Sequence, residues 1–553
     1  MHVLAASGLR LDLDMFDYLI LALYFITVLG IGFAARAAIR SSSDFFLSGR
    51  SMPAWVTGLA FVSANLGAIE IIGMAANGAQ YGLMTLHYYW VGAVPAMVFL
   101  GIVMMPFYYG SKVRSVPEFL RRRFNNSTHL FNAVSFAVAQ VLIAGVNLYA
   151  LALILEALLG WPLWVSIMLG AAIVLVYITL GGLSSAIYNE VLQFFVILAG
   201  LIPITIVGLV KVGGIDGLFE KVRQSPLGEP GLHTWANTGS TDNPLGASWI
   251  GIIFGLGFVL SFGYWTTNFA EVQRALSAKS ENAARRTPII GAFPKLLIPA
   301  VTVIPGLIAL VTVQGLGTDE GDLVYNNAIP LLMRDLLPNG VLGVAVTGLL
   351  ASFMAGMAAN VSGFNTVFTY DIWQAYIRKD RDDQHYLRVG RYATIAGVLV
   401  GIGTAFIAAG FSNIMNYIQA LFSLFNAPLF ATFIVGMFWK KMSPWAGFWS
   451  LFLGFLASLG LYIAHLTDAI HFNSDLDESF WGAGAAFVVA VIVAVIVTQF
   501  TPSKREEELR GLVYGLEGAA GAVLAGEKVW WRNPVLLGGI AVTLAVLLYI
   551  PVW

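Results

Sequence analysis

The chain has 553 residues, of which 58% are hydrophobic and 11% are charged, and its mean hydropathy is +0.78. This composition predicts an all-α integral membrane protein and argues against a soluble enzyme. The absence of cysteine excludes disulfides and thiol chemistry, and the formal net charge of −1 indicates no class of partner.

Long apolar segments follow one another along most of the chain. A helix that crosses a bilayer needs about 20 mostly apolar residues. The opening MHVLAASGLRLDLD is short and polar, unlike a cleaved signal peptide, so we expect the first apolar segment to remain as a helix. Fourteen segments are long enough, at residues 14–37, 54–79, 82–109, 129–158, 162–182, 186–211, 247–277, 287–314, 340–371, 388–411, 414–439, 444–466, 479–499 and 530–551.

Lysine and arginine are concentrated in alternate loops. The richer loops contain Arg36, Arg40, Arg50, Lys112, Arg114, Arg121, Arg122, Arg123, Arg274, Lys279, Arg285, Arg286, Arg378, Lys379, Arg381, Arg388, Arg391, Lys440, Lys441, Lys504, Arg505, Arg510, Lys528 and Arg532. The loops between them contain Arg10, Lys211, Lys221, Arg223 and Arg334. By the positive-inside rule the richer loops are cytoplasmic, so an even number of spans places both termini on the extracellular or periplasmic side of the cell membrane. We interpret the basic runs as topogenic and not as nucleic-acid-binding.

Two of the apolar segments are interrupted by glycine and polar residues. The second contains SANLGAIE at residues 63–70, and the seventh contains FGYWTTN at residues 262–268. They open two successive groups of five helices, and the odd number of spans inverts one group relative to the other. Backbone that leaves the helix inside a bilayer needs partners in protein or in a water-filled cavity. The pattern is typical of secondary transporters and predicts a site for a polar solute or an ion.

These breaks divide the chain into four parts. Residues 1–53 form an N-terminal segment with the first helix, residues 54–211 and 247–439 form the two inverted repeats, and residues 444–553 form accessory helices. The polar stretches between the helices are too short for a soluble catalytic domain. No nucleotide-binding P-loop and no nucleophile motif occurs in a suitable setting, which argues against ATP-driven transport and against an enzyme.

Six runs of sequence resemble the sodium/solute symporter family, above all its sodium/galactose branch, which includes the sodium/glucose cotransporters. The runs are SSSDFFLSGRSMPAWVTGLAFVSANLGAIEIIGMAANGAQYG, SVPEFLRRRF, LGGLSSAIYNEVLQFF, QRALSAKS, FTYDIW and MFWKK. The resemblance extends from about Ser43 to Lys441. It implies a LeuT-like fold with inverted five-helix repeats, alternating access, and a coupling ion held between the first broken helix and the ninth helix.

For the coupling sodium ion, the resemblance implies ligands on three helices. Backbone carbonyls of Ser63 and Leu66 belong to the first broken helix, and a further carbonyl belongs to Ser352 in the ninth helix. Hard cations prefer such oxygen ligands. Glu190 corresponds to an acidic residue that supports the site, although its place near a cytoplasmic helix end is also compatible with simple solvation.

The sodium pattern is incomplete in this chain. The family has two adjacent hydroxyl residues in the ninth helix, and this sequence has Ala355 and Gly356 there. Because two side-chain oxygen ligands are lost, the resemblance implies a weakened or absent sodium site at this place. Proton coupling through Glu70 or Glu190 and uncoupled transport therefore remain alternatives. No cofactor other than the coupling ion is implied.

Glu70 is the least expected residue of the first break. Sugar-carrying relatives have a polar, usually uncharged residue there, and an isolated carboxylate in mid-membrane costs about 2.5–3.5 kcal/mol on insertion scales. We therefore expect Glu70 to face the cavity and to pair with a cation or to carry a proton. Lys295 matches a substrate-binding lysine of the galactose branch and is the candidate partner, either in a purely structural pair or in solute binding.

The sugar pocket of the family is only partly kept. Tyr264 matches the tyrosine that closes the pocket from the inside, and Gln419 matches a glutamine that binds sugar hydroxyls. Tyr89 stands where the family has an acidic residue, and Ile143 stands where it has an asparagine, with Asn147 one turn further on. Tyr89 is a candidate for the pocket wall, although such aromatic residues more often serve packing between membrane helices than solute binding.

Together these residues predict an ion-coupled secondary transporter for a sugar or a similar small polar solute. Sodium is the expected ion by resemblance. A solute sensor or a channel built on the same fold is the alternative from a different functional class. Nothing in the sequence indicates a nucleic-acid partner.

Overall fold

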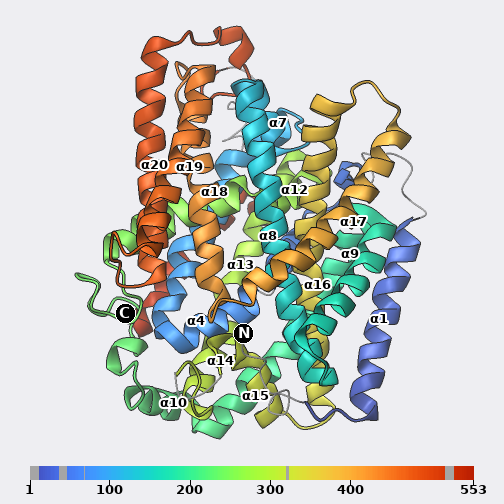
Figure 1. The fold of residues 1–553 in the computed structure, drawn as a ribbon, viewed down its shortest axis with the longest axis vertical. Coiled ribbons are helices and arrows are strands. Elements are labelled where there is room, and N and C mark those ends of the chain that lie inside the picture. Colours follow the sequence, from blue (N-terminus) through green and yellow to red (C-terminus); the bar gives the residue numbers. More distant parts are fainter. Residues whose placement is uncertain (1–10, 37–45, 68, 319–322, 517–528) are drawn as a thin grey trace.

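The computed structural model describes residues 11–36, 46–67, 69–318, 323–516 and 529–553. Within these residues all regular secondary structure is helical, apart from one isolated β-bridge between Met52 and Ala278. Figure 1 shows the long helices running along the long axis of the molecule, with short helices and loops at both ends.

The long helices are α1 (Met15–Arg36), α8 (Asn126–Leu159), α9 (Leu163–Val212), α13 (Glu281–Leu297), α14 (Pro299–Thr312), α16 (Val341–Val367), α17 (Asp383–Ala408), α18 (Ile414–Phe438), α19 (Pro444–Leu466), α20 (Asp475–Phe500) and α21 (Pro534–Tyr549). One further span combines η4 (Tyr88–Ala93), α5 (Val94–Phe99), η5 (Leu100–Met104) and α6 (Met105–Gly110). The π-helix η9 (Phe368–Ile377) extends α16, and the short helices α7 (Val116–Arg123), α10 (Gly214–Arg223) and α15 (Ala328–Leu336) lie in connections.

The fourteen predicted spans compare with 11 to 13 candidate spans counted by helix length and composition in the part of the chain that the structure describes. Within the described residues, eleven helices are long and apolar enough to cross a membrane, and two bent helix pairs bring the number to 13. The predicted segments 162–182 and 186–211 belong to one helix, α9, and the first of them contributes only the shorter apolar stretch Leu163–Leu175. No proline or charged residue occurs between Leu163 and Tyr188, so no strong breaker ends the helix there.

The two bent pairs are the interrupted segments that the sequence indicated. In the first, α3 (Ala54–Asn65) is followed by η2 (Ile69–Gly73), α4 (Met74–Tyr81) and η3 (Gly82–Leu86), and the axis bends by 59°. In the second, η7 (Gly251–Ser261) and α11 (Phe262–Thr267) precede α12 (Phe269–Leu276), with a bend of 50°. Asn268 causes the second break, since its extended backbone ends α11 and its side chain caps α12 by accepting from the Ala270 N–H at 3.0 Å.

The first broken helix packs tightly against α13 and α14 along its whole length. A Cβ on Gly78 would lie 2.5 Å from the carbonyl oxygen of Val303, and a Cβ on Gly306 would lie 2.1 Å from that of Ala75. On the other side of the break, a Cβ on Gly58 would lie 2.7 Å from a side-chain carbon of α13. Only glycine allows these helix axes to approach so closely.

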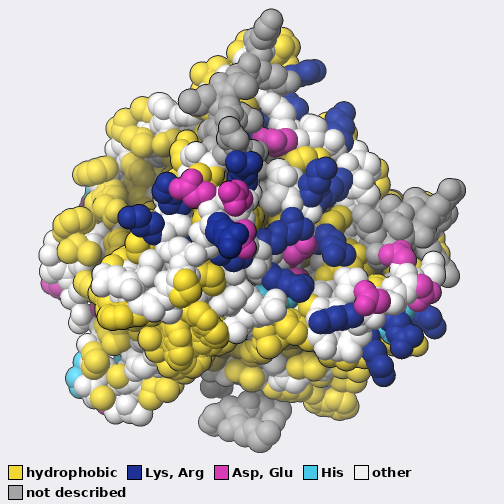
Figure 2. Space-filling view, turned by 90° about the horizontal axis from the view of Figure 1, so that it is seen from above, with side chains coloured by type: hydrophobic (Ala, Val, Ile, Leu, Met, Phe, Trp, Pro, Cys, Tyr) yellow, Lys and Arg dark blue, Asp and Glu magenta, His cyan; other side chains and the backbone are white. Residues whose placement is uncertain are grey.

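The two ends of the molecule differ in charge. Figure 2 looks onto the upper end of Figure 1 and shows lysine and arginine side chains gathered there. At the lower end, Asp17 of α1 accepts hydrogen bonds from the N–H groups of Gly340 and Gly343, both at 2.7 Å. His233 donates from Nδ1 to the carbonyl of Trp553 at 2.8 Å. The start of α1 and the last residue therefore both lie away from the basic end.

Candidate solute and ion site

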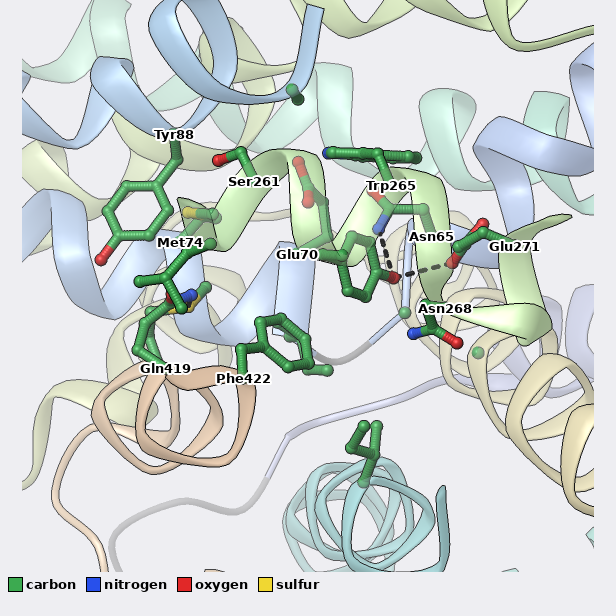
Figure 3. Close-up of a pocket in the computed structure, with 18 of the residues that line it drawn as sticks. Asn65, Glu70, Met74, Tyr88, Ser261, Trp265, Asn268, Glu271, Gln419 and Phe422 are labelled. Carbon is green, nitrogen blue, oxygen red and sulfur yellow. Dashed lines mark hydrogen bonds between the residues drawn. The ribbon is translucent and has the colours of Figure 1, made fainter. Parts of the chain in front are cut away.

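A small cavity lies between the two broken helices, where α13 and α18 also contribute side chains. It encloses about 70 Å³ of space that the centres of water molecules can occupy, which is enough for several waters. All five residues that the sequence assigned to solute binding line it: Glu70, Tyr89, Tyr264, Lys295 and Gln419. Figure 3 shows Glu70, Trp265, Glu271, Gln419 and Phe422 around this space.

Glu70 and Lys295 form a buried ion pair in the wall of the cavity. Lys295 Nζ lies 2.7 Å from Glu70 Oε2, and the residues are 2% and 3% exposed, respectively. The ring centroids of Tyr89 and Trp265 lie 5.2 and 5.3 Å from the same ammonium, within the range of cation–π attraction. A buried ammonium and carboxylate compensate each other's charge, so the sequence-based expectation of a partner for Glu70 agrees with this geometry.

A chain of hydrogen bonds connects this ion pair to the second broken helix. Lys295 also donates to Asn65 Oδ1 at the end of α3, so the amide nitrogen of Asn65 faces the other way. That nitrogen donates to Tyr264 Oη at 3.0 Å, and the tyrosine hydroxyl donates to Glu271 Oε1 at 2.7 Å, as the dashed lines in Figure 3 show. These five side chains link α13 to both broken helices. A movement of one broken helix would therefore be transmitted to the other.

The other two residues predicted to bind solute, Tyr89 and Gln419, line the same cavity. Each uses a polar group in a contact within the protein. The Tyr89 hydroxyl lies 2.9 Å from Thr302 Oγ1 in α14, which leaves its ring as the surface near the cavity. Gln419 donates from Nε2 to the sulfur of Met415 at 3.2 Å, a weak acceptor that a solute hydroxyl could readily replace. Both therefore offer contact surface to the cavity.

The residues expected to bind sodium lie beside the cavity and not in its wall. Ser63, Leu66 and Ser352 are fully buried, and the hydroxyls of the two serines have no hydrogen-bond partner among the described residues. The Ser63 carbonyl accepts from the Leu66 N–H at 3.1 Å. Each of these two hydroxyls has lone pairs that a cation could use, while the Ser63 carbonyl already accepts a hydrogen bond within the break.

The two missing hydroxyl side chains of α16 are replaced by a close backbone contact. A Cβ on Gly356 would lie 3.0 Å from the Cα of Gly67 and 2.7 Å from Asn147 Oδ1. The broken segment therefore lies directly on α16 at this point, and the Asn147 side chain supplies an oxygen there. Asn147 also lines the cavity, as does Gly356.

Glu190 is held in a buried ion pair on the far side of the second broken helix. Arg274 of α12 contacts it with Nη2 at 2.5 Å and with Nε at 3.3 Å, and both side chains are fully buried. Glu190 is therefore not a solvated carboxylate, and Arg274 is not an exposed loop residue. The guanidinium contacts both carboxylate oxygens, so Glu190 connects α9 to α12.

No role was predicted from the sequence for three side chains that take part in these contacts: Asn65, Glu271 and Arg274. Asn65 stands inside the quoted motif but received no role. Glu271 is an acidic residue within an apolar segment, and that fact alone marks it as a candidate. Arg274 was counted with the cytoplasmic basic residues, although it is fully buried.

Comparisons with known proteins identify a family and relatives that this chain resembles. A family profile described as "Sodium:solute symporter family" matches residues 45–454. A sodium/glucose cotransporter of Vibrio parahaemolyticus is 30% identical over 451 residues, which cover 79% of this chain and 83% of that protein. A sodium/myo-inositol cotransporter 2 of Oryctolagus cuniculus is 29% identical over 477 residues, covering 80% of this chain and 69% of that protein.

Solved structures show the same fold. A Na+-coupled sialic acid symporter in a substrate-bound outward-open state superposes with a TM-score of 0.73 at 20% identity, covering 89% of this chain and all of that chain. Mhp1, a nucleobase-cation-symport-1 family transporter, superposes with a TM-score of 0.52 at 15% identity, covering 85% of this chain and 97% of that one. The expected LeuT-like, all-helical membrane fold is therefore confirmed.

Proposed function

Because the chain belongs to the sodium:solute symporter family, we propose that it is a sodium-coupled symporter for a sugar or a similar small polar solute. The family consists of membrane transporters, so the chain is a multi-pass transporter and not an enzyme. The solute class is the part of this statement that goes beyond family membership.

The observation that carries the proposal is the chain of polar side chains around the cavity. Lys295, Asn65 and Tyr264 present an ammonium, an amide and a hydroxyl from three separate helices, and Gln419 faces them from α18. A small polyhydroxylated solute needs several donors and acceptors around it, together with aromatic surface for its apolar faces. Tyr89, Tyr264 and Phe422 line the cavity and supply that surface. The sugar and inositol cotransporters among the relatives support the same solute class.

Transport by this site requires that it open to one side of the membrane at a time. Tyr264 joins the end of α3 to α12 through Asn65 and Glu271, so breaking these bonds would separate the two broken helices on that side. The Tyr264 ring also packs on Phe422 of α18, with the centroids 4.7 Å apart. We therefore assign Tyr264 the role of a gate that closes the cavity when a solute is bound.

Proteoliposomes test the proposal directly. The purified protein is reconstituted, an inward sodium gradient is imposed at fixed pH, and uptake of radiolabelled glucose, galactose and myo-inositol is measured against choline controls. Accumulation above the external concentration that depends on the sodium gradient is the expected result. Accumulation against a gradient would also exclude a sensor or a channel. Uptake that does not depend on the sodium gradient would contradict sodium coupling.

Proton coupling is the second candidate, and the contact between Gly67 and Gly356 favours it. This contact stands where the family has hydroxyl ligands for sodium, so the chain offers fewer oxygens at that place. Glu70 and Glu271 are buried carboxyl groups at the cavity that a proton could neutralise. Uptake that rises with an inward proton gradient in sodium-free buffer would establish this alternative.

A further inference from the structure

A second group of polar side chains lies outside the cavity, where α18, α19 and α20 meet. Glu478, near the start of α20, is 1% exposed, and its Oε1 has no hydrogen-bond partner among the residues that the structure describes. Ser423 of α18 and Ser458 of α19 are fully buried, and their hydroxyl oxygens lie 3.1 Å apart. A buried carboxylate oxygen without a partner is unfavourable, so something must compensate it.

These three oxygens converge on Gly482, one turn further along α20. A Cβ on Gly482 would lie 3.3 Å from Glu478 Oε1, 3.3 Å from Ser458 Oγ and 3.6 Å from Ser423 Oγ. Because glycine has no side chain, no group of Gly482 separates these oxygens. We call Glu478, Ser423 and Ser458 the α18–α20 oxygen cluster.

The hydroxyl protons of the cluster are already engaged elsewhere. Ser423 donates to the carbonyl of Ala420 at 2.9 Å, so Ser458 is the donor in the bond between the two serines. Ser479 donates its proton to the other carboxylate oxygen of Glu478, at 3.2 Å. Each hydroxyl carries a single proton, so none is left for Glu478 Oε1. Lone pairs of the three oxygens therefore face one another between α18, α19 and α20, and a positive charge among them would compensate them.

We propose that the α18–α20 oxygen cluster binds a monovalent cation such as sodium. Carboxylate and hydroxyl oxygens are the ligands that hard cations prefer. The cluster contains a single carboxylate, which balances one positive charge, and no group of three acidic or histidine side chains suited to a divalent ion occurs within the described residues. Charge balance therefore favours a monovalent ion over calcium or magnesium.

The start of α20 carries further acidic side chains. Asp475 lies one turn before Glu478, and its side chain is 62% exposed, so it can attract cations toward the cluster. Its other neighbours are Asn416, which donates to Asp475 Oδ2 at 3.1 Å, and His465, whose Nε2 lies 3.5 Å from Oδ1. Asp477 is buried in the same turn and adds to the negative potential.

Cation binding here would act on the wall of the solute cavity. Ser423 lies one helical turn after Gln419 on α18, and Phe422 stands between them in sequence. A bound cation would hold α18 against α19 and α20, and would thereby fix both cavity residues. The cluster is separate from Ser63 and Ser352, so it adds a cation site to the one that the family resemblance implies.

Equilibrium dialysis with sodium-22 tests the proposal. The purified full chain is dialysed at pH 8 in a choline chloride background, and bound sodium is counted per chain. The wild type should bind about one more sodium than Glu478→Gln or Gly482→Ala, since the first change removes the charge and the second adds a methyl group beside the oxygens. Gly484→Ala is the matched control on α20, because a Cβ there would meet only Phe254, at 3.4 Å.

Two results would overturn the proposal. One is equal sodium binding by the wild type and both cluster variants. The other is an infrared band of a protonated carboxyl at pH 8 that Glu478→Gln removes and sodium does not change, because a proton would then be the positive charge. If Glu478→Gln does not fold, Gly482→Ala and Ser458→Ala carry the comparison. Solute uptake by the same preparations tests the proposed function separately.

Discussion

Gly67 in the first broken helix lies against Gly356 of α16, and a Cβ on Gly67 would be 3.1 Å from the Cα of Gly356. Asn147 Oδ1 lies beside both, 2.8 Å from the Cβ position of Gly67 and 2.7 Å from that of Gly356. The place where the family resemblance implies hydroxyl ligands is thus closed by backbone. A hydroxyl cannot be added there without separating the two helices, so this chain must hold its ion with other oxygens or with a different geometry.

This contact predicts the effect of enlarging Gly356. Gly356→Ala should lower stability by about 1–3 kcal/mol, because the added methyl group overpacks a closed contact. Gly403→Ala on α17 is the control, since a Cβ there meets nothing within 4 Å. Thermal unfolding in detergent measures both variants. Equal melting temperatures would show that the helices separate at no cost.

The Glu70–Lys295 pair predicts strongly non-additive mutations. Removing one partner of a buried pair should destabilise the protein by about 3–5 kcal/mol, because the other charge is left uncompensated. Glu70→Gln and Lys295→Met should therefore each cost more than half of the combined change in the double variant. Chemical unfolding measures stability, and uptake measures function. Additive effects would contradict direct pairing, and unchanged transport in Glu70→Gln would make the carboxylate purely structural.

Tyr264 should matter more for solute binding than Tyr89. Tyr264→Ala removes a ring from the cavity and both hydrogen bonds of its hydroxyl, whereas the Tyr89 hydroxyl is bound to Thr302 outside the solute position. Calorimetric titration with the transported solute should show the larger loss of affinity for Tyr264→Ala. Tyr264→Phe isolates the hydroxyl, whose bond to a charged group is worth about 1.5–3 kcal/mol. Equal losses of solute affinity at Tyr264 and Tyr89 would contradict the assignment of Tyr264 as the gate.

Glu190 should act on stability and not on ion affinity. Glu190→Gln leaves Arg274 buried without a full countercharge, so the yield of folded protein and its melting temperature should fall. In the protein that remains folded, the sodium dependence of uptake should keep its midpoint. Glu506→Gln, which breaks the exposed pair with Lys440, is the control and should leave both quantities unchanged. A shifted sodium midpoint in Glu190→Gln would show that Glu190 contributes to ion binding.

Membrane orientation can be tested because the chain contains no cysteine. Asp468 lies in the connection between α19 and α20 and has an 87% exposed side chain, and Lys379 is exposed between η9 and α17. In whole cells, a membrane-impermeant maleimide should label Asp468→Cys, and should label Lys379→Cys only after permeabilisation. The cysteine-free parent is the blank. The reverse pattern would place both chain ends in the cytoplasm.

The sequence was sufficient for the two breaks and for the pair across the cavity. Glycine and asparagine inside apolar segments weaken a helix locally, so Gly67 and Asn268 could be recognised from composition and spacing alone. Glu70 was expected to need a partner because an isolated charge in a bilayer is costly, and Lys295 was the candidate because the family resemblance implies a substrate-binding lysine there. These inferences depend on local preference and on the energetic penalty of bare charge, and both are properties of single residues.

The remaining partners depend on tertiary packing. Arg274 lies 84 positions from Glu190, and nothing in the sequence separates it from the basic residues of the following loop. Asn65 acts through the orientation of its amide, which is set by the ammonium of Lys295. The length of α9 also escaped prediction, because no local signal says whether two apolar segments in a row share one helix.

The glycine contacts between α4 and α14 limit how this protein can move. At Gly78 and Gly306 the two backbones touch, so neither helix can slide along the other without a steric clash. The first broken helix, α13 and α14 must then turn as a single rigid block during the transport cycle. Distances measured within this block by spin labels should stay constant, while distances from the block to α18 should report every change between the two open states.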